Sequence, residues 1–283
     1  MGECDGKVAF VTGASRGIGR AIARRFAAEG ASVVVCASRL GSHEGLEGTL
    51  EQTVEVIQAA GGKAAAIACD LSDPSAREGL VERASSFFGP IDILVNNAAG
   101  THMKLPSQCT TEERSFMFDM NVNGPVDLAQ QAIPDMRSKG AGWILNISSA
   151  TAKQPEVPYR DSKLAAWVIG PYGSTKSALN RYTVALAHEV AEAGIFVNAM
   201  APTSIVLTSG AAYVRDIARN NPDMAEPVEM MAEGALELCT GHHVGRVIFS
   251  RDIVHAVNRK VKSVDGKQVL GDAYLEADLE STA

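Results

Sequence analysis

The sequence predicts an α/β fold in which helices cover both faces of a doubly wound parallel sheet of about seven strands. Short apolar runs typical of buried strands alternate with segments whose apolar residues recur at helical spacing. A glycine-rich turn joins the first run to the first helix. The chain contains no linker-like or low-complexity stretch, so we expect one domain over residues 1–283.

Composition narrows the function classes. Net charge is −7 at pH 7 and no run of lysine and arginine occurs, which argues against a nucleic-acid partner. No apolar stretch reaches membrane-spanning length and no secretion signal begins the chain, so we expect a cytoplasmic protein. The five cysteines are sparse and typical of buried thiols, and the six histidines lack metal-ligand spacing, so we expect no metal site.

The first strand, turn and helix form an arrangement suited to an anion. Residues 7–12 are apolar, residues 13–19 contain three glycines, and the helix that follows ends at Gly30. Glycines let the backbone approach a ligand, and the free amides of a helix start attract phosphate. Because this turn lies between a strand and a helix, we interpret it as a dinucleotide site rather than a merely structural turn.

The second strand, residues 32–37, indicates which dinucleotide is bound. It ends without the acidic residue that binds the adenosine ribose of NAD. Ser38 and Arg39 follow instead, and Arg16 lies in the glycine-rich turn. A serine and two cations suit a 2′-phosphate, so NADP(H) is favoured over NAD(H). The alternative is that Arg39 is an ordinary loop arginine.

The remaining elements continue the alternation. Strands are predicted at residues 63–70, 91–95, 143–150, 195–202 and 246–250, and helices at residues 50–60, 72–88, 111–139, 172–193 and from 251. Residues 203–240 are expected to form short helices. Asn121 to Gly124 interrupt the helical pattern at 111–139, which predicts a local distortion with a functional cause or a break between two shorter helices.

Two Tyr-x-x-x-Lys pairs are candidates for proton transfer: Tyr172 with Lys176, and Tyr159 with Lys163. On a helix, such residues share one face. The ammonium favours the phenolate and so lowers the pKa of a tyrosine beside it. Spacing alone does not choose between the pairs, but the prolines around Tyr159 oppose a continuous helix there.

Together these pieces resemble the short-chain dehydrogenase/reductase family over about residues 5–208. The matching motifs occur in the family's order: Thr12-Gly13-Ala14-Ser15-Arg16-Gly17-Ile18-Gly19, Asp70, Asn96-Asn97-Ala98, Asn121-x-x-Gly124, Ser149 and Val197-Asn198-Ala199-x-x-Pro202. The chain departs from the pattern at Ala99, where relatives have glycine. It departs again after Pro202, where Thr203 replaces a glycine and Thr208 lies one residue farther along than the usual threonine.

The resemblance selects Tyr172 and Lys176. Relatives have a small-Ala-Leu run after the lysine and an asparagine on the next strand, and Lys176 is followed by Ser177-Ala178-Leu179 and, 22 residues on, by Asn198. The distance from Ser149 to Tyr172 is longer than in relatives. Residues 152–170 are therefore a predicted insertion, which either borders the active site or serves as a packing or subunit-contact loop.

The resemblance also implies roles. Tyr172 would be the general acid or base, Lys176 would assist it, Ser149 would hold the substrate oxygen, and Asn121 would anchor a relay water. The implied coenzyme contacts are Gly13, Ser15, Arg16, Ile18, Gly19, Ser38, Arg39, Asp70, Leu71, Asn97, Ala98, Tyr172, Lys176, Ile205 and Thr208.

These roles imply a Rossmann-fold oxidoreductase that interconverts a ketone and a secondary alcohol with NADP(H), acting as a homodimer or homotetramer. The segment 203–240 covers the substrate in relatives, and its methionines favour a bulky apolar substrate unless they only pack the core or an oligomer contact. Residues 250–283 are expected to form a C-terminal extension. The alternative function is a catalytically silent dinucleotide-binding sensor or structural partner, although such proteins typically lack the tyrosine or the lysine.

Overall fold

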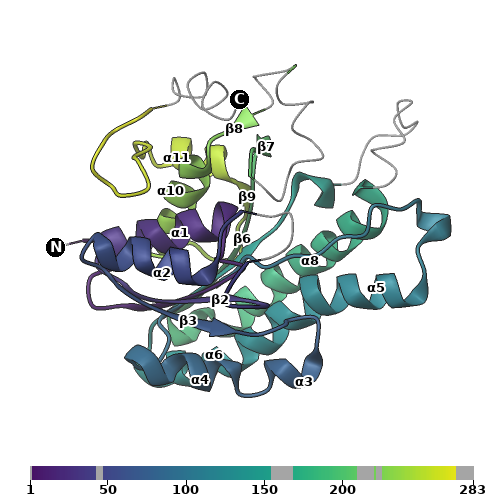
Figure 1. The fold of residues 1–283 in the computed structure, drawn as a ribbon, viewed down its shortest axis with the longest axis horizontal. Coiled ribbons are helices and arrows are strands. Elements are labelled where there is room, and N and C mark those ends of the chain that lie inside the picture. The colour runs from purple at the N-terminus through teal and green to yellow at the C-terminus, as the bar shows by residue number, and fades with distance from the viewer. Residues whose placement is uncertain (1, 43–46, 154–167, 209–219, 221–224, 272–283) are drawn as a thin grey trace.

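The computed structural model describes residues 2–42, 47–153, 168–208, 220 and 225–271 (Figure 1). The pair Tyr159 and Lys163 and most of the predicted insertion lie outside these residues. Within them, no helix combines the length and the apolar character needed to cross a bilayer.

A parallel sheet of seven strands forms the centre, in the order β3-β2-β1-β4-β5-β6-β9. The strands are β1 (Val8–Thr12), β2 (Ser32–Ala37), β3 (Lys63–Ala68), β4 (Ile93–Asn96), β5 (Gly142–Ile147), β6 (Ile195–Ala201) and β9 (Val247–Phe249). The chain builds outward from β1 to β3 and then returns to the other side of β1 with β4. Ligands of open parallel sheets bind at such a reversal, beyond the carboxyl ends of the strands.

Helices cover both faces of the sheet, which confirms the predicted fold class (Figure 1). One face carries α1 (Gly17–Ala28), α2 (Leu50–Ala59), α10 (Val228–Leu238) and α11 (Ser250–Ala256). The other carries α4 (Leu80–Phe88), α6 (Gly124–Lys139) and α8 (Gly173–Val190). Strand residues alternate between the two cores, as in a sheet buried on both faces: Phe10 and Val34 face one, Val11 and Val35 the other.

The helix predicted at 72–88 is two helices, α3 (Pro74–Arg77) and α4. Gly79 separates them with a left-handed backbone (φ 60°) that a helix interior does not adopt. Because the helix breaks there, the buried Arg77 extends toward α6, and its Nε donates to Asp127 Oδ2 of that helix at 2.7 Å. Sequence periodicity missed the break because the apolar positions continue through it.

The distortion predicted at Asn121 is a π-helical turn, η2 (Asp119–Asn123), between α5 (Thr111–Phe118) and α6. Pro125 occupies the first turn of α6, where a missing amide hydrogen costs little. The functional interpretation of the interruption, rather than a plain break between helices, agrees with the tendency of π turns to occur at functional sites.

Of the residues expected to form short helices, 203–240, most of 209–224 lie outside the described residues; the described part contains the helix α10, as expected, and two strands that were not expected. Strands β7 (Ile205–Val206) and β8 (Ala225–Glu226) pair in parallel, and α10 follows. Met230 and Met231 of α10 are fully buried in the core between α1 and the sheet. These two methionines therefore pack the core, the alternative that the sequence left open.

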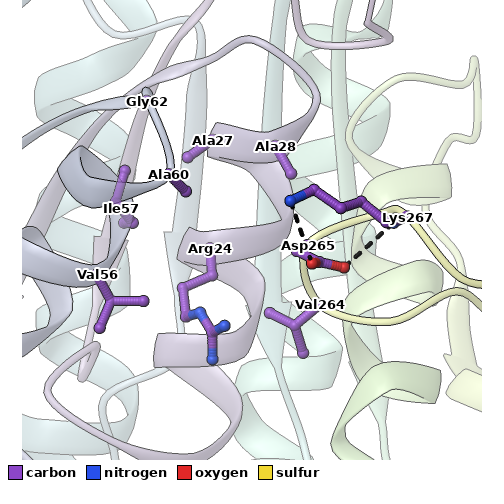
Figure 2. Close-up of a pocket in the computed structure, with 10 residues that line it drawn as sticks. All are labelled: Arg24, Ala27, Ala28, Val56, Ile57, Ala60, Gly62, Val264, Asp265 and Lys267. Atoms are coloured by element: carbon purple, nitrogen blue, oxygen red, sulfur yellow. Dashed lines mark hydrogen bonds and ion pairs between the residues drawn. The ribbon is translucent and has the colours of Figure 1, made fainter.

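The C-terminal extension folds back over α1 after α11. Val264 packs on Ala21 of α1 and Ala232 of α10, and an isolated antiparallel bridge joins Lys262 to Val269. This turn forms a hollow with α1 and α2, whose volume is about 180 Å³. Figure 2 shows the residues that line it. Lys267 at its rim pairs with Asp265 of the same turn, at 3.8 Å. None of the residues predicted to bind coenzyme or substrate lines this hollow.

Candidate active site

A cleft of about 410 Å³ opens at the reversal of strand order, beyond the carboxyl ends of β1, β2, β3 and β4. It contains most of the predicted coenzyme residues. Its lining comprises Gly13, Ser15, Arg16, Gly17, Ile18, Ala37, Ser38, Cys69, Leu71, Asn97, Ala98, Ala99, Met120 and Thr208.

Hydrogen bonds between the ends of β1 and β4 hold the glycine-rich turn in place. Thr12 Oγ1 accepts from the amides of Asn97 and Ala98, both at 3.0 Å, and Asn97 Nδ2 donates to the carbonyls of Thr12 and Gly13. Gly13 has φ +64°, and a Cβ there would lie 2.7 Å from Asn97 Nδ2. Only glycine fits this approach, so the turn is a preformed cradle of backbone amides beside the cleft.

Arg16 supplies a cation with unused hydrogen-bonding capacity. Its Nε and Nη2 are buried and have no hydrogen-bond partner among the described residues. Burial lowers the pKa of its guanidinium. Buried donors without partners are costly, and a ligand phosphate in the cleft could accept hydrogen bonds from these two nitrogens. The residues present therefore fit a dinucleotide.

Of the other predicted coenzyme residues, some line the cleft and some do not. Ser38 lines the cleft, but Arg39 lies on the exposed loop beyond it and is not part of the lining. Leu71 lines the cleft, while the exposed Asp70 uses Oδ1 to accept from the amide and hydroxyl of Ser72. Gly19 is buried behind the turn, where a Cβ would lie 2.5 Å from Gly13 O, so close packing requires glycine there, and its coenzyme contact stays a prediction.

Of the two residues predicted on the nicotinamide side, one lines the cleft and the other does not. Thr208 lines the cleft and lies against the glycine-rich turn, since a Cβ added to Gly17 would be 3.1 Å from Thr208 Cγ2. Ile205 belongs to β7 and is not part of the lining. The extra residue before Thr208 therefore does not remove this threonine from the cleft.

Lys176 is the buried cation of the site. Its Nζ donates to the carbonyl of Ile147 at the end of β5 at 2.8 Å and lies 5.8 Å from the centre of the Tyr172 ring. Burial of the side chain lowers the pKa of Lys176 to about 8. Without a carboxylate partner among the described residues, the ammonium is held there at an energetic cost, which is typical of a functional group.

Asn121 joins the π turn to its neighbours through its side chain. Oδ1 accepts from the amide of Gly100 at 2.9 Å, and Nδ2 donates to the carbonyl of Gly100 and to Thr175 Oγ1. Thr175 Oγ1 in turn donates to the carbonyl of Tyr172 at 2.7 Å. The Asn121 amide is thus engaged with protein partners, and the water-anchoring role stays a prediction.

Ser149 follows β5 and begins the short helix η3 (Ala150–Ala152). Its Oγ accepts from the amide of Thr151 at 3.2 Å and is hydrogen-bonded to Thr151 Oγ1 at 2.9 Å, and a serine hydroxyl can also donate to a substrate oxygen. This segment lies against the start of α8: a Cβ on Gly173 would be 2.5 Å from Thr151 O. The fold thus brings together the segments of Ser149, Tyr172 and Asn121.

Comparison with known proteins agrees with this geometry. A family model described as short chain dehydrogenase matches residues 7–217. The chain belongs to the short-chain dehydrogenase family. An uncharacterized oxidoreductase of Methylorubrum extorquens is 40% identical to it over 208 residues, 73% of this chain and 76% of that protein. Hydroxysteroid dehydrogenase-like protein 2 of Homo sapiens is 34% identical over 208 residues, which are 74% of this chain and 48% of that protein. The chain therefore aligns with about half the length of the human relative.

Solved structures of similar short-chain dehydrogenases contain either coenzyme. A 3-oxoacyl (acyl-carrier-protein) reductase from Agrobacterium tumefaciens, with NADP bound, is 29% identical with a TM-score of 0.73. A 7α-hydroxysteroid dehydrogenase complexed with NADH and 7-oxo glycochenodeoxycholic acid is 29% identical with a TM-score of 0.75. Each comparison covers 87% of this chain and 93% of the other.

Sequence reasoning missed several contributors to the site of this short-chain dehydrogenase. Thr175 connects Asn121 to Tyr172, and Cys69 and Met120 line the cleft. The position of Thr175 between Tyr172 and Lys176 was a usable signal, because a threonine hydroxyl on a helix can bond a carbonyl one turn earlier. No local pattern marks Cys69 or Met120, since their place in the lining depends on how strand ends and the π turn meet.

Proposed function

We propose that this short-chain dehydrogenase interconverts a ketone and a secondary alcohol with NADP(H). The observation that supports this most is the buried Lys176, held by Ile147 O and facing the Tyr172 ring, next to the Ser149 segment. All four residues that the family uses for catalysis are present. Silent sensors of this fold typically lack the tyrosine or the lysine, and this chain has both.

Bound coenzyme would supply or accept the hydride. The protein's own residues would handle the oxygen and its proton. In ketone reduction, Ser149 Oγ donates a hydrogen bond to the carbonyl oxygen and the Tyr172 hydroxyl gives its proton to it; alcohol oxidation reverses both. Charged Lys176 favours the phenolate that Tyr172 becomes after reduction.

Three observations support a preference for NADP(H). Arg16 has two buried nitrogens without described partners, it lines the cleft, and Ser38 at the end of β2 lines it too. Among the described residues that line the cleft there is no acidic side chain that would repel a 2′-phosphate.

The proposed substrate is bulky and apolar. Relatives named for hydroxysteroids support this, among them the human hydroxysteroid dehydrogenase-like protein 2 and the 7α-hydroxysteroid dehydrogenase. Residues 203–240 would cover it. We further propose a single catalytic domain, a cytoplasmic location and assembly as a homodimer or homotetramer.

A screen of steroid, terpenoid, aromatic and fatty-acyl ketones, followed by NADPH absorbance, tests the proposed activity. We expect turnover with at least one class and a fall of about 10²- to 10⁴-fold in kcat for Tyr172→Phe, the range attributed to general acid–base catalysis. NADPH affinity should change little. Tyr182→Phe, on the same helix α8, is the matched control and should keep its turnover. Full turnover in Tyr172→Phe would refute the assignment, and tight NADPH binding without turnover across the panel would favour the sensor.

Coenzyme preference is tested by titrating NADPH and NADH against protein fluorescence. Wild type should bind NADPH more tightly, and Arg16→Ala should weaken NADPH binding about tenfold while affecting NADH less. Arg24→Ala is the control, because Arg24 belongs to α1, the helix that follows Arg16, but lines the hollow of Figure 2 instead of the cleft. Tighter binding of NADH by the wild type would overturn the preference.

A further inference from the structure

Strands β7 and β8 hold the two ends of one chain segment side by side. Ile205 pairs with Ala225 and Val206 pairs with Glu226. The strand β7 leads directly to Thr208, whose side chain lies against Gly17 in the coenzyme cleft. The placement of Thr208 therefore depends on what fixes β7 and the residues before it.

A buried carboxylate fixes that stretch of backbone. Glu226 is 2% exposed, and its Oε2 accepts from the amides of Thr203 at 2.7 Å and Ser204 at 3.2 Å. Its Oε1 accepts from the hydroxyl of Ser250, the first residue of α11. One side chain thus ties the end of β6, strand β8 and the start of α11 together.

The carboxylate of Glu226 bonds the stretch after Pro202, where the sequence departs from the family pattern. The chain has Thr203 in place of a glycine and one more residue before its threonine, yet Thr208 still reaches the glycine-rich turn. The Thr203 amide is bonded by Glu226 and lies 3.3 Å from Ser250 Oγ, and Thr203 Oγ1 accepts from the amide of Arg251. The altered loop is therefore held at both its backbone and its side chain.

We infer that Glu226 is a positioning residue that holds the backbone at Thr203 and Ser204 so that Thr208 is placed against the coenzyme. The inference rests on the proposed coenzyme-binding function. Burying a carboxylate is unfavourable unless its hydrogen bonds are made, and an apolar residue would suffice if only packing were needed. Burial raises the pKa of the Glu226 carboxyl, and the bonds from Ser250, Thr203 and Ser204 oppose that rise.

The test is the dissociation constant of NADPH, measured by fluorescence for purified, folded variants. Glu226→Ala removes the acceptor of both amides and should weaken NADPH binding about tenfold, because hydrogen bonds to a charged group are among the stronger ones. Glu226→Gln keeps a side-chain oxygen that can accept from the backbone amides of Thr203 and Ser204. This variant should bind NADPH with an affinity within about threefold of wild type. In a double-mutant cycle, Glu226→Ala should add little to Thr208→Ala, because it acts through that residue.

Glu233→Gln is the matched control. Glu233 is another buried carboxyl group, but its ion-pair partners are Arg25 and Arg259, and it is not among the described residues that line the cleft. It should lose stability and keep the wild-type NADPH affinity. If Glu226→Ala does not fold, Glu226→Asp withdraws the carboxylate by one methylene and should show the same direction of change.

Two outcomes overturn the inference. Folded Glu226→Ala, or Glu226→Asp in its place, that binds NADPH as wild type does would show that the contact has no bearing on the coenzyme. Full additivity with Thr208→Ala would show that Glu226 does not act through Thr208. Failure of wild type to bind either NADPH or NADH would instead refute the proposed function itself, so the two failures are distinguishable.

Discussion

Lys176 combines a folding cost with the chemical role that we propose for it. Its aliphatic stem and ammonium are enclosed, and the described hydrogen bond of its Nζ goes to a neutral carbonyl, that of Ile147. Water stabilises a charged amine better than this environment does, which is why burial lowers the pKa to about 8. Near neutral pH the side chain is mostly charged, and it is close enough to Tyr172 to influence the proton on its phenol.

The shifted pKa predicts a pH dependence of stability. Between about pH 8 and the unfolded pKa of about 10.4, the unfolded chain binds the Lys176 proton and the folded chain does not. The free energy of unfolding of the coenzyme-free protein should therefore gain a rising contribution over this window. Lys176→Met should lack it, which urea unfolding from pH 7.5 to 10 will show as curves that diverge in favour of the wild type.

Lys63→Met, at an exposed position of β3, is the control and should give a curve parallel to wild type. Parallel curves for Lys176→Met as well would contradict the burial of a charged amine in the folded state.

At the scale of elements, the site depends on two places where helices depart from regular geometry. The π turn η2 presents Asn121 toward Gly100 and Thr175. A second π-helical turn, η4 (Val168–Tyr172), precedes α8 and ends at Tyr172. Regular α-helices would rotate these side chains onto other faces, so the irregular turns decide which residues meet.

Gly173 sets the distance between α8 and the segment of Ser149. A Cβ there would be 2.5 Å from the backbone oxygen of Thr151, so Gly173→Ala must push η3 away from α8. Misplacement by about 1 Å can cost on the order of 10²-fold in turnover, and we expect a loss of this size in ketone reduction. Coenzyme affinity should change little, because the cleft lies at β1 and β4.

Gly140→Ala controls for the general cost of replacing a glycine. Gly140 ends α6 with φ +65° and has no atom within 4 Å of an added Cβ, so this variant should lose stability and keep its turnover. Equal turnover in Gly173→Ala and wild type would show that the approach of η3 to α8 does not matter for catalysis.

At the scale of the whole molecule, a buried ion-pair network joins both ends of the described chain. Glu233 of α10 accepts from Arg25 of α1 at 3.0 Å and from Arg259 of the C-terminal extension at 2.8 Å. Arg259 also pairs with Glu3 near the N-terminus. The network fixes α1, α10 and the extension as one layer behind the glycine-rich turn (Figure 1).

Removing the central carboxylate should destabilise the protein strongly. Glu233→Gln removes the charge of one of the two carboxylates that pair with the fully buried Arg25, which keeps Glu29, and of one partner of Arg259; the loss of a partner by a buried charge costs on the order of 3 kcal/mol. Urea unfolding measures the change. Arg137→Ala breaks the exposed pair with Glu189 and should change stability by less than about 1 kcal/mol. Similar stability of Glu233→Gln and wild type would contradict a structural role for the network.

The sequence by itself determined the fold class, the seven main strands and the family. These follow from local patterns: apolar runs mark buried strands, and glycines, asparagines and the Tyr-x-x-x-Lys spacing mark turns and sites that need those residue types. It also located the distortion at Asn121, because asparagine and glycine in a helical pattern are a local signal.

Only the tertiary structure decided the rest. The break at Gly79, the pairing of β7 with β8, and the contacts of Glu226 and Thr175 join residues whose neighbours in the sequence give no sign of the contact. The same holds for the methionines at 230 and 231, whose apolar character suits a core and a pocket equally. Burial, and the lowered pKa of Lys176 that follows from it, arise when separate segments exclude water together, which no single segment specifies.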